Sequence, residues 1–267
     1  MRRKMELISP TLSYEGFENA DVIIEAVAEK MGVKKQVLQD IEKHMREDSI
    51  FASNTSALSI TGLQSAARIP ERVCGMHFFN PVHKMPLVEV VRGEKTDDRT
   101  VAAIFKLAKT LNKIPIVVKD SPGFLVNRLL GIYLNEACLL AEEGFEYAWI
   151  DGLVKKFGMP MGPFRLIDEV GIDIAVEVAR LLGEVFKGRL QSSSVLDKMY
   201  EAGFKGKKSK KGFYIYQTGR KKRFNENVRR FLPGTKKEKA SEVIQRMMYL
   251  MVNEAARCLE ENVVESP

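Results

Sequence analysis

Hydrophobic residues in the first part of the chain follow two alternating patterns. Short apolar runs rich in Val, Ile and Ala are typical of buried strands in a parallel sheet, whereas apolar residues three or four positions apart are typical of amphipathic helices. The predicted strands are residues 20–27, 49–54, 73–78, 87–91 and 114–120, and the predicted helices are residues 30–48, a short one within 55–66, and 96–113. This alternation predicts a doubly wound α/β sheet.

The pattern changes close to residue 119. Asp120 or Ser121 is suited to cap a helix with Pro122 at its first position, and from there to about residue 200 the pattern is helical. Residues 212–216 form a predicted short strand, and residues 241–262 a predicted amphipathic helix whose apolar face has little sequence left to pack on. We therefore expect an α/β domain over 1–119, a helical domain over 120–217, and a linker with one helix of an interrupted domain over 218–267.

Composition narrows the class of protein. The chain has 267 residues, 45% of them hydrophobic and 29% charged, which is typical of a folded globular protein. No apolar run has the length of a membrane span, and we expect no transmembrane segment. Three cysteines lie far apart, which argues against a disulfide framework or a zinc site and favours a reducing compartment.

The net charge of +7 comes largely from two basic clusters, 205–211 and 219–223. Such clusters suit a phosphate-rich small molecule such as a nucleotide or coenzyme A, and the alternative is a solvated basic surface. No zinc-finger spacing or RNA-binding aromatic motif accompanies them, so we expect no nucleic-acid partner.

Two ionisable residues interrupt apolar strands. His77 lies between Met76 and Phe78, and Glu89 lies within Leu-Val-Glu-Val-Val, twelve positions later on the next predicted strand. Neighbouring strands place such residues side by side, and a carboxylate that binds one imidazole nitrogen leaves the other as a base. The alternative is a histidine satisfied within the core and a glutamate on an edge strand.

Polar residues also follow the strand that ends near residue 54. Ser56 belongs to a polar cluster over 52–58, where the carboxyl ends of parallel strands bind ligands, although helix capping explains the cluster equally well. Asn127 lies in the apolar helical pattern of 123–130. A buried amide must find a partner, which is either a ligand or another helix.

Six segments together resemble one known family. They are ADVIIEAVAE, FASNTSALSI, GMHFFNPVHKMPLVEVV, KDSPGFLVNRLL, GMPMGPFRLIDEVGIDIA and KKGFYIY. In this order they resemble the 3-hydroxyacyl-CoA dehydrogenase family over about residues 15–216. The tail from residue 251 resembles the start of the second helical repeat of multifunctional fatty-acid β-oxidation α-subunits.

The resemblance implies NAD-dependent oxidation of (S)-3-hydroxyacyl-CoA to 3-oxoacyl-CoA. It implies a Rossmann-type sheet followed by a helical C-terminal domain. His77 matches the family's catalytic base and Glu89 the carboxylate that orients it. Ser56 and Asn127 match residues that bind the reacting oxygen and place the substrate.

The resemblance also implies a cofactor site for NAD. Asn80 matches a residue near the nicotinamide, and Ser56 is also expected to bind the cofactor. Glu29 and Lys34 match positions that contact the ribose and phosphate region. Lys208 matches a cofactor-contacting lysine, with Lys210 in place of the glycine usually found shortly after it.

The chain departs from the family at its beginning. No G-x-G-x-x-G turn occurs anywhere in the sequence, and the residues before 20 are fewer than the roughly 30 that a βαβ unit needs. The first βαβ of the Rossmann sheet is therefore expected to be absent, which leaves an open sheet edge. We expect a fragment or one half of a split enzyme.

The resemblance further implies partners and a location. The substrate would be an acyl-CoA, and the protein partner a second copy or a thiolase subunit. The location would be the cytoplasm, or the mitochondrial matrix in a eukaryote. Two alternatives stay open: a non-catalytic scaffold or dimerisation fragment, and a dehydrogenase of a related short hydroxy acid.

Overall fold

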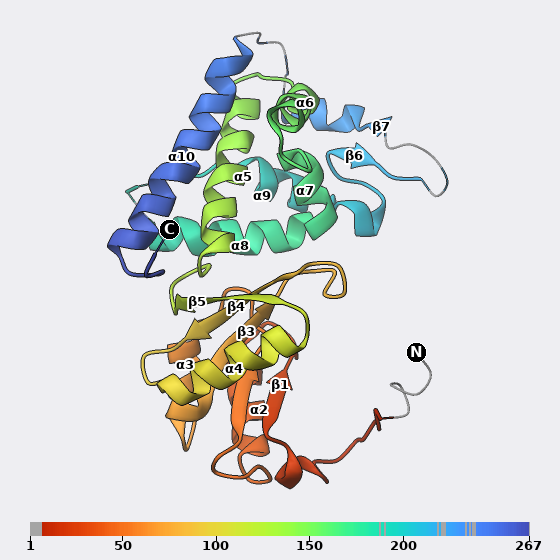
Figure 1. Cartoon of the computed structure of the whole chain (residues 1–267). Helices are drawn as coiled ribbons and strands as arrows, with labels where there is room; N and C mark the ends of the chain where they lie inside the picture. The colour runs from red at the N-terminus through yellow and green to blue at the C-terminus, as the bar shows by residue number, and fades with distance from the viewer. Residues whose placement is uncertain are drawn as a thin grey trace. The chain divides into compact units, whose positions relative to one another are not determined.

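The computed structural model describes residues 7–186, 188–189, 191–217, 219, 223–232, 234, 236 and 239–266. The chain divides into two compact units, Met1–Phe124 and Leu125–Pro267. The first unit contains the sheet and the second contains most of the helices (Figure 1).

The first unit is built on a five-stranded sheet in the order β1-β2-β3-β4-β5 (Figure 1). The strands are β1 (Val22–Glu25), β2 (Ile50–Ser53), β3 (Val73–Phe78), β4 (Leu87–Arg92) and β5 (Ile114–Lys119). The β3–β4 pair is antiparallel and the other pairs are parallel. Residues 79–86 are too few for a parallel crossover, which needs a dozen or more residues, so β4 returns directly beside β3. The prediction of a mostly parallel, Rossmann-type sheet is confirmed.

Three α-helices cover the sheet: α2 (Met31–Ile41), α3 (Ile60–Gln64) and α4 (Asp98–Thr110), with two short turns, η1 (Phe17–Asn19) and η2 (Pro70–Arg72). Helix α4 begins where the Asp97 side chain accepts a hydrogen bond from Thr100 N at 2.6 Å. Its Ile104 and Ala108 pack in one buried cluster with Cys74 and Met76 of β3. The helix thus fixes the strand that carries His77.

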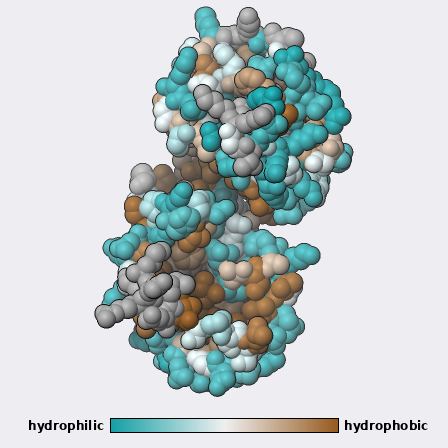
Figure 2. Space-filling view, turned by 90° about the vertical axis from the view of Figure 1, so that its right-hand side faces the viewer, coloured by the Kyte–Doolittle hydropathy of each residue, from teal (hydrophilic) through white to brown (hydrophobic). Residues whose placement is uncertain are grey.

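Strand β1 forms one edge of the sheet. Within the described residues β1 pairs only with β2, and its Ile24 side chain is 43% exposed. Figure 2, which looks onto this side of the first unit, shows hydrophobic surface there. Within the described residues, β1 is therefore an edge strand.

The second unit is mainly helical, as predicted. Its helices are α5 (Val126–Glu142), α6 (Tyr147–Phe157), α7 (Pro163–Val170), α8 (Ile172–Val185), α9 (Val195–Glu201) and α10 (Ala240–Glu260). A small hairpin of β6 (Tyr214–Ile215) and β7 (Arg223–Phe224) and the turns η3 (Lys207–Ser209) and η4 (Glu226–Arg230) complete it. No helix in the described ranges is long and apolar enough to cross a membrane.

The expected cap of the first helix in this unit was wrong. Helix α5 begins at Val126 with Leu125 at its N-cap. Gly123 and Phe124 have φ angles of 75° and 52°, so the backbone before the helix turns away from helical geometry. Asp120 instead accepts hydrogen bonds from Ser59 Oγ at 2.6 Å and Thr61 N at 2.7 Å, and it stabilises the start of α3.

The expectation that the last helix has little to pack on was also wrong. Helix α10 lies along α5 (Figure 1), and its Val243 and Met247 belong to the same buried cluster as Ala137 and Ala141 of α5. The apolar face is therefore covered within this unit. A helix pattern predicts that a face is buried, but the pattern does not say which earlier element buries it.

Candidate active site

His77 and Glu89 are direct cross-strand partners on β3 and β4. The Nδ1 atom of His77 lies 2.7 Å from Oε2 of Glu89. The two residues are 5% and 0% exposed. A carboxylate accepts hydrogen bonds, so Nδ1 carries the proton and Nε2 carries the lone pair of the neutral imidazole. This arrangement holds a histidine in the tautomer that a general base needs.

Two aromatic rings pack against the imidazole. The ring centroid of Phe79 lies 4.5 Å from that of His77, and the centroid of Phe124 lies 5.8 Å away. Phe124 is fully buried and holds the uncommon φ of 52°. The rings exclude water from the sides of the imidazole that they cover, so its orientation depends on Glu89 and on this packing.

A polar cluster lies at the carboxyl ends of β1 and β2. Oε1 of Glu29 accepts hydrogen bonds from Thr55 Oγ1 at 2.6 Å, from Ser56 N at 2.8 Å and from Ser56 Oγ at 3.2 Å. Glu29 therefore orients the Ser56 hydroxyl, which donates a hydrogen bond to the carboxylate.

Lys34 lies behind this cluster and is 1% exposed. Its Nζ is 2.8 Å from Oε1 of Glu25 and 3.3 Å from Oε2 of Glu29. Oε2 of Glu25 in turn accepts a hydrogen bond from Ser53 Oγ at 2.6 Å. The ammonium group of Lys34 thus lies between two carboxylates. Its ion pair with Glu29 keeps that carboxylate in place at the carboxyl edge of the sheet.

Sequence reasoning missed Glu25 as part of this arrangement. The residue interrupts the apolar run of β1 in the same way that Glu89 interrupts β4, and a buried carboxylate needs a partner. The same signal that singled out Glu89 was therefore present for Glu25.

The environment of Glu29 favours its ionised form. Partial burial opposes ionisation, but hydrogen bonds from Thr55 and Ser56 and the charge of Lys34 outweigh it, so the pKa of Glu29 lies below its ordinary value. The carboxylate is 34% exposed. It is therefore a charged hydrogen-bond acceptor at the carboxyl edge of the sheet.

Asn80 lies beyond the end of β3 and is exposed. It precedes a cis peptide bond to Pro81. Asn54, at the end of β2, accepts a hydrogen bond from Phe78 N at 3.0 Å through its side chain. The first unit thus brings His77, Glu89, Ser56, Glu29 and Lys34 to neighbouring strand ends, with Asn80 in the loop that follows.

The other two predicted site residues belong to the second unit. Asn127 lies in the first turn of α5. Lys208 lies in η3 and forms an ion pair with Asp173. Lys210 has a φ of 60° and a ψ of 8°, the left-handed conformation that favours glycine. Lys210 therefore adopts the backbone conformation that is typical of glycine, although it has a side chain.

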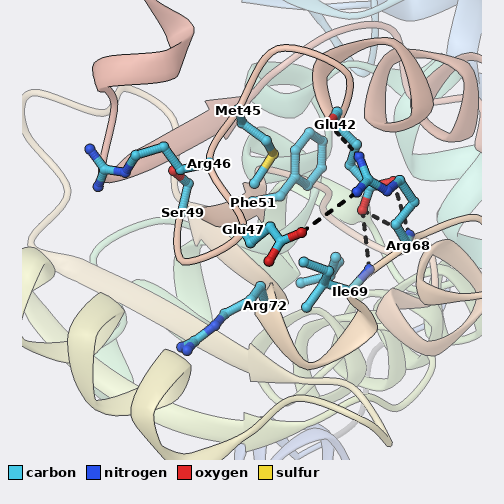
Figure 3. Close-up of a pocket in the computed structure, with 10 residues that line it drawn as sticks. Glu42, Met45, Arg46, Glu47, Ser49, Phe51, Arg68, Ile69 and Arg72 are labelled. Carbon is cyan, nitrogen blue, oxygen red and sulfur yellow. Dashed lines mark hydrogen bonds and ion pairs between the residues drawn. The ribbon is translucent and has the colours of Figure 1, made fainter.

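A separate cavity lies at the opposite ends of the strands (Figure 3). Its lining includes Arg46, Arg68 and Arg72 together with Glu42 and Glu47. Each arginine already has a carboxylate partner. The cavity volume of about 20 Å³ holds little more than one water molecule. It has no part in the arrangement around His77.

Two models of one protein family match most of the chain. Residues 1–121 match the family model for the 3-hydroxyacyl-CoA dehydrogenase NAD binding domain, and residues 123–216 match the model for the C-terminal domain of the same family. The family models thus meet close to the junction between the two compact units.

Curated relatives are similar over nearly the whole chain. A fatty acid oxidation complex subunit alpha of Acinetobacter baumannii (strain SDF) is 46% identical over 275 residues, which cover 99% of this chain and 38% of the relative. The chain therefore spans less than half the length of this relative.

Two solved structures share the fold. One is (S)-3-hydroxybutyryl-CoA dehydrogenase from Ralstonia eutropha, with 40% identity and a TM-score of 0.74 over 78% of this chain and 75% of that one. FadB2 of Mycobacterium tuberculosis has 38% identity and a TM-score of 0.77 over 81% of this chain and 78% of that one.

Proposed function

The chain belongs to the 3-hydroxyacyl-CoA dehydrogenase family, and from this premise we propose that it oxidises (S)-3-hydroxyacyl-CoA to 3-oxoacyl-CoA with NAD in fatty-acid β-oxidation. The observation that carries the proposal is the buried contact of 2.7 Å between His77 and Glu89. The chemistry needs a base at one fixed position, and this pair supplies a base with a defined tautomer.

His77 is the general base of the proposed reaction. Nε2 takes the proton of the substrate 3-hydroxyl, and the imidazole becomes an imidazolium. Glu89 stabilises that charge and keeps the ring in place through Nδ1. NAD, when bound, accepts the hydride that leaves C3.

Ser56 and Asn127 bind the reacting oxygen in this proposal. The Ser56 hydroxyl, which lies against Glu29, turns its donor toward the substrate oxygen in this proposal, while the proton of that oxygen goes to His77. The amide of Asn127 has donors that suit the same oxygen once it becomes a carbonyl. Hydrogen bonds to the reacting oxygen favour one orientation of the substrate C3.

The residues of this chain fit the nicotinamide and ribose end of NAD. Glu29 is an ionised and partly exposed acceptor at the carboxyl edge of the sheet, where open α/β sheets bind nucleotides. Lys34 holds Glu29, and Asn80 is exposed in the loop after β3. Lys208, which forms an ion pair with Asp173, contacts the cofactor in this proposal.

The sequence lacks the glycine-rich turn that usually binds the diphosphate of NAD. No two glycines of the sequence are separated by a single residue, so the G-x-G-x-x-G turn does not occur. We therefore assign no residue of this chain to the diphosphate.

We extend the proposal to organisation, partners and location. Residues 1–119 form the C-terminal part of the NAD-binding domain, 120–217 the substrate and dimerisation domain, and 218–267 a linker with the first helix of a second helical repeat. The relatives named as subunits of a fatty acid oxidation complex support assembly with a partner subunit, and we propose a thiolase subunit or a second copy as that partner. Their bacterial origin and three unpaired cysteines support a cytoplasmic location.

The test is oxidation of NADH by the purified chain with acetoacetyl-CoA, beside the variant His77→Gln. We expect activity that falls by about 10² to 10⁴ in the variant, the usual contribution of a general base. Equal activity of both proteins would refute the assignment of His77. Inactivity of both would refute catalysis by this chain alone.

One alternative function is that of a non-catalytic scaffold or dimerisation segment. This sequence holds no G-x-G-x-x-G turn, the element that usually binds the diphosphate of such cofactors. A scaffold would not bind NADH, whereas the proposed enzyme does, so the quenching of NADH fluorescence on titration distinguishes the two. A dehydrogenase of short hydroxy acids would show the same NADH binding and turn over a substrate without coenzyme A.

A further inference from the structure

The first turn of α5 is held by an ion-pair cluster that includes the last helix. Arg128 follows Asn127 directly and is 1% exposed. Its Nε lies 2.6 Å from Oε1 of Glu254, and its Nη1 lies 2.7 Å from Oε2 of Glu261. Arg189 adds contacts of 3.1 Å with Glu254 and 3.2 Å with Glu261.

Aromatic packing fixes the same arginine from another side. The guanidinium carbon of Arg128 lies 4.9 Å from the ring centroid of Phe186, and that of Arg189 lies 4.7 Å from the same centroid. A guanidinium over an aromatic face gains a cation–π contact and loses rotational freedom. The side chain of Arg128 is thus held in one position by two carboxylates and one ring.

The cluster contacts the first turn of α5, the turn that carries Asn127. The N-cap of this helix is Leu125, whose side chain cannot accept a capping hydrogen bond. Phe124 and Gly123, which precede it, have positive φ angles. Arg128 is therefore a side chain that ties this turn to another helix.

Stability alone is a poor explanation for the cluster. A buried ion pair is often no more stabilising than apolar side chains of the same volume, and its best-supported benefit is that it fixes one geometry. Arg246 of α10 also pairs with α5, both with Glu136 and with Glu143, which lies at the far end of α5 from Asn127. The side chains of Arg246 and Glu143 are 41% and 39% exposed, whereas that of Glu136 is 8% exposed.

We propose that Arg128, Glu254 and Glu261 form a positioning clamp, through which α10 fixes the first turn of α5 and the direction of the Asn127 amide. The inference rests on the proposed role of Asn127 in substrate placement. It assigns a task to α10, which lies beyond residue 216, where the family model ends. Glu254 and Glu261 are positioning residues, and neither touches substrate.

The clamp is tested first by hydrogen exchange of the whole chain, measured by mass spectrometry. In Glu254→Gln we expect exchange in peptides covering residues 125–130 to accelerate at least tenfold relative to peptides of α6. Glu261→Gln, at a half-exposed position, should give a smaller change of the same kind and guards against misfolding. Glu143→Gln is the matched control and should leave 125–130 unchanged.

The second measurement is the affinity for acetoacetyl-CoA by calorimetry. We expect Asn127→Ala and Glu254→Gln each to weaken binding by roughly tenfold, because small misplacements of a binding group are costly, while Glu143→Gln binds as the unchanged chain does. If Asn127→Ala weakens binding and Glu254→Gln does not, the clamp is overturned and the proposed function stands.

The exchange experiment stays decisive if the proposed function fails. Should Asn127→Ala bind normally, or the unchanged chain not bind at all, the role of Asn127 is refuted. Faster exchange confined to 125–130 in Glu254→Gln would still support the clamp. Exchange that rises equally in Glu254→Gln and Glu143→Gln, or in neither, would overturn it.

Discussion

His77 and Glu89 face each other across the only antiparallel pair of the five-stranded sheet that the structure describes. Antiparallel strands place two residues directly opposite, with short distances between their side chains. Because β4 runs antiparallel to β3, Glu89 lies directly opposite His77 and on the same face of the sheet, where its carboxylate reaches the imidazole. Both groups are buried, so the contact works in a medium of low polarity, which strengthens it.

The first prediction concerns the charge of Glu89. In Glu89→Gln the side chain keeps its shape, but a neutral amide replaces the charge that stabilises the imidazolium. We expect turnover to fall by roughly 10² or more, with a smaller effect on acyl-CoA affinity. Steady-state kinetics with acetoacetyl-CoA and NADH measure both.

Glu94→Gln provides the control, since Glu94 is an exposed glutamate shortly after β4. It should leave turnover unchanged. An effect of Glu89→Gln no larger than that of Glu94→Gln would show that the pair has no part in the reaction.

The sheet and this pair were predictable from the sequence because both depend on local patterns. The run 73–78 was predicted as a strand and coincides with β3, since Val, Met and Phe on a buried strand leave little ambiguity. His77 and Glu89 were expected side by side because a short connection joins their strands. The direction of β4 follows from the same connection.

Contacts between distant parts of the chain were not predictable in this way. Asp120 accepts hydrogen bonds from Ser59 and Thr61 at the start of α3. Its local sequence instead predicts a cap for the helix that follows it in the chain. The partner of α10 is α5, more than a hundred residues earlier. The burial of Lys34 between Glu25 and Glu29 likewise needed the fold, because lysine in a helix pattern is normally exposed.

A second prediction concerns the pH dependence of stability at Glu29. Its pKa is lowered from 4.5 in the folded chain, so ionised Glu29 stabilises the fold above pH ~4.5 and this contribution disappears as the pH falls through the folded pKa. Thr55→Val removes one donor to the carboxylate and raises that pKa. It also removes the acceptor of Leu58 N and Ala57 N, a loss that does not depend on pH. We expect a loss of about 1 kcal/mol at neutral pH, reduced for partial exposure, that shrinks on acidification.

Urea unfolding at a series of pH values measures this difference. Thr110→Val is the matched control, because Thr110 Oγ1 donates to the backbone oxygen of Lys106 and to no carboxylate in the described contacts. Its effect should be independent of pH. A Thr55→Val effect that is equally independent of pH would contradict the assigned cause of the shift.

The third prediction concerns Lys210. A left-handed backbone costs roughly 1 kcal/mol for a residue with a Cβ atom and little for glycine. Lys210→Gly should therefore stabilise the second unit by up to about 1 kcal/mol. Thermal unfolding should show a higher midpoint.

Lys198→Gly is the matched control, because glycine should lower the stability at that position rather than raise it. Lys198 lies inside α9, where glycine costs about 1 kcal/mol, and both changes remove one positive charge. Destabilisation by both substitutions would show that the turn at Lys210 gains nothing from glycine.

The short connection between β3 and β4 also has a consequence for the order of folding. His77 and Glu89 are 12 positions apart, whereas Arg128 and Glu254 are 126 apart. Loop-closure entropy grows with the logarithm of the separation, so the first contact forms at a cost about 2 kcal/mol lower than the second. The proposed base and its carboxylate can therefore meet early in folding, while the turn that carries Asn127 is secured only after the last helix has docked.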